Sequence, residues 1–327
     1  MPEFLQLHSI EQARQKFLDW LPVPKRGSET VETYSALGRV LSESVLSPED
    51  SPAFNRSTVD GYAVRATDTY GASDSLPAYL HLAGEVKMGE EPKLRLVKGD
   101  AALIHTGGML PEQCDAVVML EHSHLLDNGD VEIYKGVSKH ENVLLRGEDV
   151  TAGAQVLKAG KRVRPEEIAA LLALGITKVS VYQKPVVSIL SSGDEVIPPE
   201  QKPGIGQVRD INSHGLAALV VQAGGIPRVQ SIVPDDPQKL EEAIRSVYVN
   251  SDLVIITAGS SASERDMTAE VISRFGQPGV LVHGVNVKPG KPTILAVCDG
   301  KPMIGLPGNP VSAMVIARLF VLPLIGY

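Results

Sequence analysis

Two short stretches, far apart in the chain, carry residue types that bind anions and metal ions. Residues 287–292 read Val-Lys-Pro-Gly-Lys-Pro, which holds Lys288 and Lys291 within one turn stiffened by proline and glycine. Like charges this close repel each other, so a purely stabilising role would be unusual and the pattern favours anion binding. Further on, Asn309-Pro310 is typical of a helix start, where free backbone N–H groups attract an oxyanion.

The other stretch places a carboxylate on a tight turn. Asp60 precedes Gly61 in the run Ser-Thr-Val-Asp-Gly-Tyr-Ala-Val, residues 57–64. A carboxylate in such a turn is the kind of ligand that magnesium uses together with phosphates. The two stretches together predict oxyanion and metal chemistry.

Other loops carry polar residues whose role the residue pattern leaves open. Residues 191–195 (Ser-Ser-Gly-Asp-Glu) fit either a magnesium site or ordinary helix-start chemistry. The serine-rich residues 257–266 suit either a phosphate or a flexible turn with a helix cap. Residues 145–149 (Leu-Arg-Gly-Glu-Asp), taken alone, indicate a solvated surface loop. Thr106 fits a substrate contact or a hairpin corner, and His105 has no identifiable partner and is interpreted as structural.

Composition narrows the class of protein. The 327 residues predict two or three domains, and a net charge of -8 with 4% aromatic residues disfavours a nucleic-acid partner. The two cysteines, Cys114 and Cys298, lie far apart without a CxxC or Cys/His cluster, which argues against zinc and disulfides. No secretory signal and no apolar run of membrane-spanning length is present, so we predict a cytoplasmic protein without a membrane partner.

The periodicity of apolar residues predicts the elements that position these loops. A helix is expected from Ser9, with Gln12 completing a capping box, and a short helix over residues 36–41. Short strands separated by turn signals predict a β-rich segment from about residue 55 to 140, and a helix is expected over residues 165–174.

After residue 184 strands and helices alternate, which predicts a three-layer α/β domain with a mostly parallel sheet. Ligands bind such sheets at the carboxyl ends of the strands. The loops with unusual composition fall there, after Leu190, Thr257, Val285 and Ile304.

The ordered set of motifs resembles one family closely, the MoeA-like molybdopterin molybdenumtransferases, whose relatives include the C-terminal region of gephyrin. The resemblance runs over nearly the whole chain. It rests on Pro52, residues 57–64, Thr106-Gly107, Leu110-Pro111, Asp115–Val118, Glu121, Arg146–Asp149, Ser192–Glu195, Asp210–Asn212, Val233–Asp236, Asp266, the lysine turn and the Leu-Pro-Gly-Asn-Pro-Val-Ser-Ala run, residues 306–313.

The resemblance implies an elongated, multidomain α/β architecture that forms a homodimer. Residues 1–52 and 141–183 would make a discontinuous mixed N-terminal domain, and residues 53–140 a β-rich insert domain. Residues 184–327 would make a MogA-like three-layer α/β domain. The C-terminal β domain of such proteins is expected to be absent from this chain.

The implied reaction inserts molybdate, or tungstate, into adenylylated molybdopterin with magnesium and releases AMP, downstream of a molybdopterin adenylyltransferase. Carried over by position, the catalytic candidates are Asp60, Thr106, Asp149, Glu195 and Asp266, of which Glu195 and Asp266 are the metal candidates. The binding candidates are Ser261, Lys288, Lys291, Pro307, Pro310 and Ser312. The family has glycine where this chain has Ala258 and Ser263.

Two other functions fit parts of the chain. The α/β segment alone would suit a molybdopterin adenylyltransferase, although that function leaves the β-rich segment and the lysine turn unused. A non-catalytic pterin or oxyanion carrier, or a scaffold, is the remaining alternative.

Overall fold

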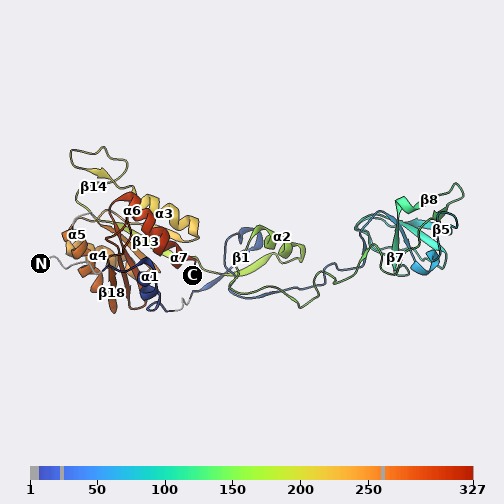
Figure 1. The fold of residues 1–327 in the computed structure, drawn as a ribbon, viewed down its shortest axis with the longest axis horizontal. Coiled ribbons are helices and arrows are strands. Elements are labelled where there is room, and N and C mark those ends of the chain that lie inside the picture. The colour runs from blue at the N-terminus through green and yellow to red at the C-terminus, as the bar shows by residue number, and fades with distance from the viewer. Residues whose placement is uncertain (1–6, 23–25, 259–261, 327) are drawn as a thin grey trace. The chain divides into compact units, whose positions relative to one another are not determined.

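The computed structural model describes residues 7–22, 26–258 and 262–326, which divide into two units (Figure 1). The α/β unit consists of residues 1–27 and 182–327, and the β unit consists of residues 28–181. We expected residues 1–52 to form a domain with residues 141–183. In the structure, the helix near the N-terminus packs in the α/β unit, where Ala13 and Phe17 are buried in its core. The finer division into domains stays a prediction.

The α/β unit is built on a six-stranded sheet. Its strands are β13 (Val186–Ser191), β16 (Ile226–Val229), β17 (Leu253–Ala258), β18 (Pro278–His283), β19 (Ile294–Cys298) and β20 (Lys301–Pro307). They lie in the order β16-β13-β17-β20-β19-β18. The first four strands in this spatial order, β16, β13, β17 and β20, pair in parallel. β19 is antiparallel to both of its neighbours, β20 and β18. β18 therefore points the same way as β13, β17 and β20.

Helices cover both faces of this sheet (Figure 1). One face packs against α1 (Ile10–Leu18), α3 (Asn212–Ala223), α6 (Pro310–Ile316), a π-helical turn (Ala317–Val321) and α7 (Leu322–Ile325). The other face packs against α4 (Pro237–Tyr248) and α5 (Ala262–Ser273). A small parallel pair, β14 (Val196–Ile197) and β15 (Val208–Arg209), lies outside the sheet. The predicted three-layer α/β fold is confirmed.

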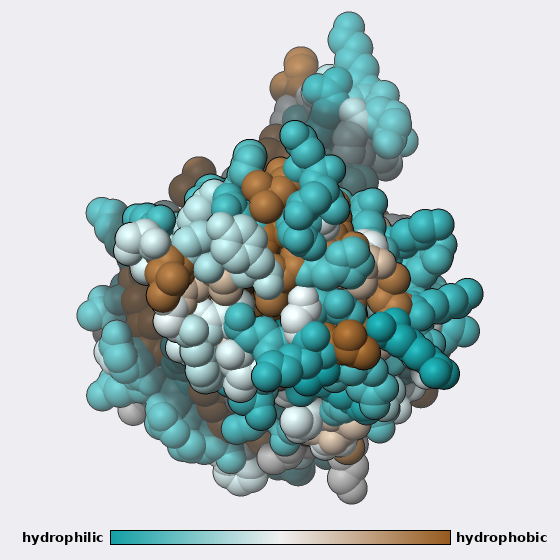
Figure 2. Space-filling view, turned by 90° about the vertical axis from the view of Figure 1, so that its right-hand side faces the viewer, coloured by the Kyte–Doolittle hydropathy of each residue, from teal (hydrophilic) through white to brown (hydrophobic). Residues whose placement is uncertain are grey.

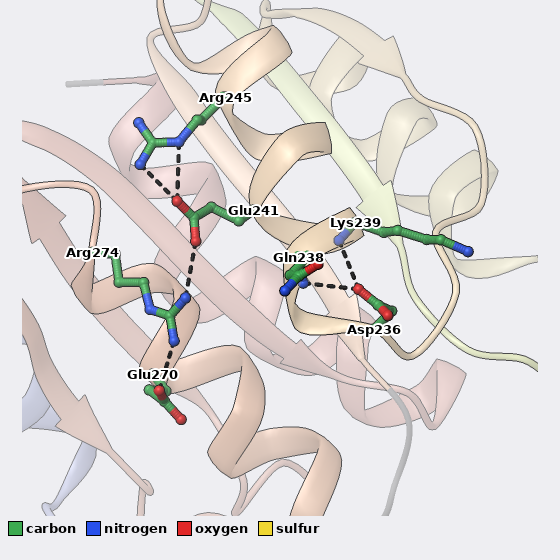
Figure 3. Close-up of polar contacts among 7 residues, drawn as sticks. All are labelled: Asp236, Gln238, Lys239, Glu241, Arg245, Glu270 and Arg274. Carbon is green, nitrogen blue, oxygen red and sulfur yellow. Dashed lines mark hydrogen bonds and ion pairs between the residues drawn. The ribbon is translucent and has the colours of Figure 1, made fainter.

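Local sequence signals set several helix ends in this unit. Ser9 and Gln12 form the predicted capping box of α1. Asp236 caps α4 by accepting hydrogen bonds from the backbone N–H groups of Gln238 and Lys239, both at 2.9 Å (Figure 3). Satisfying these otherwise unpaired N–H groups fixes where each helix begins.

An ion-pair network joins α4 to α5 (Figure 3). The carboxylate of Glu241 on α4 accepts hydrogen bonds from Arg245, at 2.7 Å, and from Arg274, at 3.0 Å. Arg274 also pairs with Glu270 on α5 at 2.7 Å. Because these ion pairs lie at the surface, the buried apolar side chains between the helices and the sheet supply most of the stability.

The β unit is organised around a second six-stranded sheet in the order β7-β4-β6-β5-β9-β8. The strands are β4 (Gly61–Val64), β5 (Ala78–Glu85), β6 (Asp100–Ile104), β7 (Ala116–Met119), β8 (Ser123–Leu125) and β9 (Asp130–Ile133). Single 3-10 turns occupy Thr33–Ser35, Ala66–Thr69 and Leu120–His122. The strands expected between residues 55 and 140 are thereby confirmed.

Short strand pairs and one helix make up the rest of the β unit. The pairs are β1 (Ser28–Glu32) with β12 (Lys178–Tyr182), β2 (Val45–Leu46) with β11 (Gln155–Leu157), and β3 (Arg56–Ser57) with β10 (Val143–Leu144). The expected helix is α2 (Pro165–Ala173). The expected helix over residues 36–41 is wrong: Leu41 bridges to Val181, since its side chain is buried with that strand.

A buried carboxylate anchors the start of α2. Glu167 has 7% of its side chain exposed and pairs with Arg164 at 2.8 Å and Lys161 at 2.9 Å. Hydrogen bonds from Arg164 and then from Lys161 lower the pKa of Glu167 to about 2. The residue is therefore ionised at neutral pH, as a buried acid with two cationic partners should be.

The surface and the thiols are those of an ordinary folded chain. Figure 2 shows one face of the molecule, on which hydrophobic residues form small patches among hydrophilic ones. Within the described residues no helix has the length and apolar character needed to cross a bilayer.

Cys114 and Cys298 are free and buried, and burial raises the pKa of their thiols to about 12 and about 11, respectively. The cytoplasmic location stays a prediction.

Candidate functional site

Four loops of the α/β unit meet at one edge of its sheet. The register pairs Ser191 with Thr257 and Ala258 with Pro307, so β13, β17 and β20 end together. β18 ends at the same edge, because His283 pairs with Ile294 and Ile294 pairs with Gly305. The loops after these four strands carry most of the predicted site residues of this unit.

The lysine turn is one of these loops and connects β18 to β19. Its backbone is closed by hydrogen bonds from the N–H groups of Val285 and Thr293 to the carbonyl of Lys291, at 2.9 and 3.0 Å. Lys288 and Lys291 are exposed and form no ion pair with the residues that the structure describes. Two cations without a carboxylate partner are available to an anion.

Contact with α6 fixes the position of the lysine turn. Gly290 has φ +120° and lies so close to α6 that an added Cβ would stand 2.5 Å from Cδ1 of Ile316. Glycine is needed both for this backbone conformation and for this approach. The contact holds the two lysines beside the helix that begins at Pro310.

The start of α6 brings the remaining binding candidates to this edge. Asn309 caps the helix: its side-chain oxygen accepts a hydrogen bond from the N–H of Ser312 at 3.2 Å. Ser312 is buried and its hydroxyl donates to the same oxygen at 3.3 Å. Pro307 is buried at the end of β20, whereas Pro310 is exposed.

A pocket of about 420 Å³ lies among these loops. Glu195 and Pro310 line it, together with Thr257 at the end of β17. The Glu195 loop is held by Asp235, whose carboxylate accepts hydrogen bonds from the hydroxyl of Ser192 at 3.0 Å and from the N–H of Asp194 at 3.2 Å. The structure thus brings Glu195 and the helix start together around one cavity.

Asp266 lies on α5, which follows β17. Its carboxylate is 62% exposed and stands 3.9 Å from Nε2 of His283, the last residue of β18. This contact places Asp266 near the same sheet edge. Ser261 lies outside the described residues. No cluster of three or more His, Cys, Asp or Glu side chains suited to a metal occurs in the described part of the chain.

The remaining candidates, Asp60, Thr106 and Asp149, lie in the β unit. Oδ1 of Asp60 accepts hydrogen bonds from the N–H of Thr106 at 2.7 Å and from its hydroxyl at 3.0 Å. These two bonds, with a smaller effect of His105, lower the pKa of the Asp60 carboxyl. His105 has carboxylate partners in Asp60 and Glu85, so its interpretation as a residue without a partner is wrong.

Asp149 is the last residue of the Leu-Arg-Gly-Glu-Asp loop, residues 145–149. Its N–H donates to the carbonyl of Ser51 at 3.0 Å, and the N–H of Gly147 donates to the carbonyl of Pro52. Ser57 bonds in turn to the 107–108 turn next to Thr106. Both loops therefore attach to the segment 51–60.

Two polar residues at the pocket were missed as site candidates. Asn212 lines it and donates from Nδ2 to the carbonyl of Gly308 at 2.7 Å, while its Oδ1 is the buried side-chain atom that lacks a hydrogen bond within the described residues. Asp210 also lines it and accepts from Ser213. The Asp210-Ile211-Asn212 motif was the available signal, but the sequence alone gave it no role.

Comparisons with known proteins agree with this architecture. Residues 8–175 match the MoeA N-terminal region (domain I and II), and residues 188–327 match the probable molybdopterin binding domain. A putative molybdopterin biosynthesis protein of Methanocaldococcus jannaschii is 39% identical over 94% of this chain and 76% of its own length. A molybdopterin molybdenumtransferase of a Nostoc species is 36% identical over 93% of this chain and 71% of its own.

A solved structure gives the same result at the level of the fold. The molybdopterin biosynthesis MoeA protein of Pyrococcus horikoshii OT3 matches with a TM-score of 0.85 and 31% identity, over 98% of this chain and 79% of that one. With family matches on both halves of the sequence, the chain belongs to the MoeA family, the molybdopterin molybdenumtransferases of molybdenum cofactor biosynthesis.

Proposed function

We propose that this chain inserts molybdate, or tungstate, into adenylylated molybdopterin and releases AMP. The observation that carries the proposal is the sheet register, which gathers the lysine turn, the Glu195 loop and the start of α6 at one edge. An oxyanion and a nucleotide-bearing substrate need such neighbouring but chemically distinct subsites. Parallel strands present ligands at this edge in many α/β folds.

In this proposal the lysine turn binds the oxyanion. Lys288 and Lys291 supply positive charge without competing carboxylates among the described residues, and Gly290 fixes the turn against Ile316. We assign Pro307, at the end of β20, and Pro310 and Ser312, at the start of α6, to the rest of the oxyanion site. Because contact with Ile316 places the turn before the anion arrives, little reorganisation should oppose binding.

Magnesium fits the donor set at this edge. Glu195 and Asp266 offer exposed carboxylates, and magnesium usually binds one or two carboxylates together with substrate phosphates. We assign Glu195 and Asp266 to hold it, with Ser261 contacting the nucleotide. When bound, the ion would neutralise charge that develops on the phosphate as AMP leaves.

The remaining catalytic candidates come from the β unit. Asp60 and Asp149 present carboxylates toward the substrate, and Thr106 orients Asp60 through its two hydrogen bonds. We further propose that the chain acts as a homodimer and receives its substrate from a molybdopterin adenylyltransferase.

The test supplies adenylylated molybdopterin, molybdate and Mg²⁺ to the purified protein and follows AMP release by chromatography. We expect release that requires molybdate and no ATP. The double variant Lys288→Gln/Lys291→Gln should raise the molybdate concentration needed, whereas Lys239→Gln, an exposed lysine on α4, should not.

The same assay separates the alternatives. Consumption of ATP with unmodified molybdopterin would identify an adenylyltransferase. Tight binding of the pterin without AMP release would identify a carrier or scaffold. Either result would refute the proposal.

A further inference from the structure

His105 lies between two carboxylates at one end of the β-unit sheet. Its Nε2 stands 3.2 Å from Oε1 of Glu85, and its Nδ1 stands 3.7 Å from Oδ1 of Asp60. The first distance is that of a hydrogen bond, and the second is that of an ion pair when the ring is charged. The three residues form a continuous row from Glu85 through His105 to Asp60.

The sheet topology brings these three residues together. β5 and β6 are parallel, with Glu85 paired to Leu103, so both strands end on the same side. β4 is antiparallel to β6, with Gly61 paired to Ile104. Asp60, just before β4, therefore meets His105, just after β6. The row follows from strand register, not from neighbouring positions in the sequence.

The polar contacts that described residues make with the Asp60 carboxylate all fall on one oxygen. Oδ1 receives the N–H and hydroxyl of Thr106 and faces the His105 ring. Within the described residues Oδ2 has no such partner, which leaves this oxygen for a ligand. Holding one oxygen sets the direction in which the other points.

The imidazole suits this task because, when the ring is charged, both of its nitrogens can donate, one toward each carboxylate. A neutral ring donates from one nitrogen only, whereas a charged ring donates from both. The bond to Glu85 fixes the rotation of the ring, and the ring in turn faces Asp60. By way of this ring, Glu85 acts on the orientation of Asp60.

We propose that His105 and Glu85 are positioning residues that orient the carboxylate of Asp60 during molybdenum insertion. The proposal rests on the function proposed above and extends it to two residues that the motifs did not identify. All three side chains are about half exposed, so the row orients a surface carboxylate and is not a packed part of the core.

The test measures kcat and KM for AMP release in Glu85→Gln, His105→Ala and the double variant. His105→Ala should lower kcat roughly 10-fold, the worth of a hydrogen bond to a charged group. Glu85→Gln should lower kcat less, because the amide oxygen can still accept from Nε2 of His105. The double variant should be no slower than His105→Ala, because Glu85 acts through the same ring. Circular dichroism confirms that each variant is folded.

A matched control exists on the same sheet. His81 lies 3.6 Å from Asp130 and is 67% exposed, against 45% for His105, so His81→Ala removes a more exposed histidine–carboxylate contact away from Asp60. We expect this variant to keep wild-type kcat. Unchanged kcat in His105→Ala, or effects of Glu85→Gln and His105→Ala that multiply, would overturn the proposal.

Imidazole ¹⁵N resonances separate this proposal from the function on which it rests. Glu85→Gln should shift the Nε2 resonance of His105, and Asp60→Asn should shift Nδ1, whether or not the enzyme turns over. Absence of both shifts would refute the row itself. Shifts in a protein that releases no AMP would refute only the proposed function.

Discussion

Substituting Gly290 tests how the lysine turn is held. In Gly290→Ala the new Cβ would lie 2.5 Å from Cδ1 and 2.6 Å from Cγ1 of Ile316, whereas carbon atoms normally approach to about 3.5–4.0 Å. Ile316 is fully buried, so it cannot swing into solvent. Either the turn or the helix must shift.

The structure sets the size of the effect. Overpacking a filled core costs about 1–3 kcal/mol, and a non-glycine residue in a strained backbone conformation costs about 1–3 kcal/mol more. We therefore expect Gly290→Ala to lower the free energy of unfolding of the α/β unit by roughly 2–6 kcal/mol. If the turn moves by about 1 Å, the rate of molybdate insertion should fall by up to ~100-fold.

Two variants separate the clash from the backbone strain. Gly206 has φ +85° and no atom within 4 Å of an added Cβ, so Gly206→Ala carries the strain alone. Ile316→Ala removes the clashing atoms, and Gly290→Ala/Ile316→Ala should therefore lose less stability than the two single changes summed.

The assay is urea denaturation followed by tryptophan fluorescence. Trp20 is the single tryptophan and belongs to the α/β unit, so its signal reports the unit that carries Gly290. If Gly290→Ala and Gly206→Ala lost the same stability, and the molybdate requirement were unchanged, the proposed anchoring of the turn would be refuted.

Three further predictions follow from the buried and charged groups. Hydrogen bonds lower the pKa of Glu167 to about 2 from 4.5; the stability that it contributes should be complete above about pH 5 and lost as the pH falls toward 2, and thermal melts of Glu167→Gln should lack this part of the acid dependence. Parallel wild-type and variant curves would contradict this assignment. Ile244→Ala on α4 removes a fully buried side chain and should cost about 2–5 kcal/mol in urea denaturation, against no more than about 0.5 kcal/mol for the exposed Glu242→Ala. Asp266→Asn should abolish most Mg²⁺-dependent AMP release, whereas Glu270→Gln, one turn later on α5 and paired with Arg274, should retain it; equal activities would remove Asp266 from the site.

Local signals made much of the α/β unit predictable. Ser9 with Gln12 predicted the start of α1, and the alternation of strands and helices predicted three layers. Once the strands were ordered as an open α/β sheet, the lysine turn and the Glu195 loop had to fall at its carboxyl edge. These inferences rest on residues close in sequence or on general rules of topology.

Contacts between distant residues were not predictable in the same way. The turn at Gly290 packs on Ile316, and His105 meets Glu85 and Asp60, only because particular strands pair in a particular register. No local pattern encodes that register. The failed helix over residues 36–41 has a similar cause, since the bridge to Val181 outweighed a short run of helix-compatible residues.

The most direct test of the central claim is to locate the oxyanion. Crystals soaked in tungstate, a heavy analogue of molybdate, would reveal the anion by anomalous scattering. We predict a peak within hydrogen-bonding distance of Lys288 or Lys291, beside the start of α6, that disappears in Lys288→Gln/Lys291→Gln. A peak elsewhere in the molecule that survives this double substitution would contradict the account.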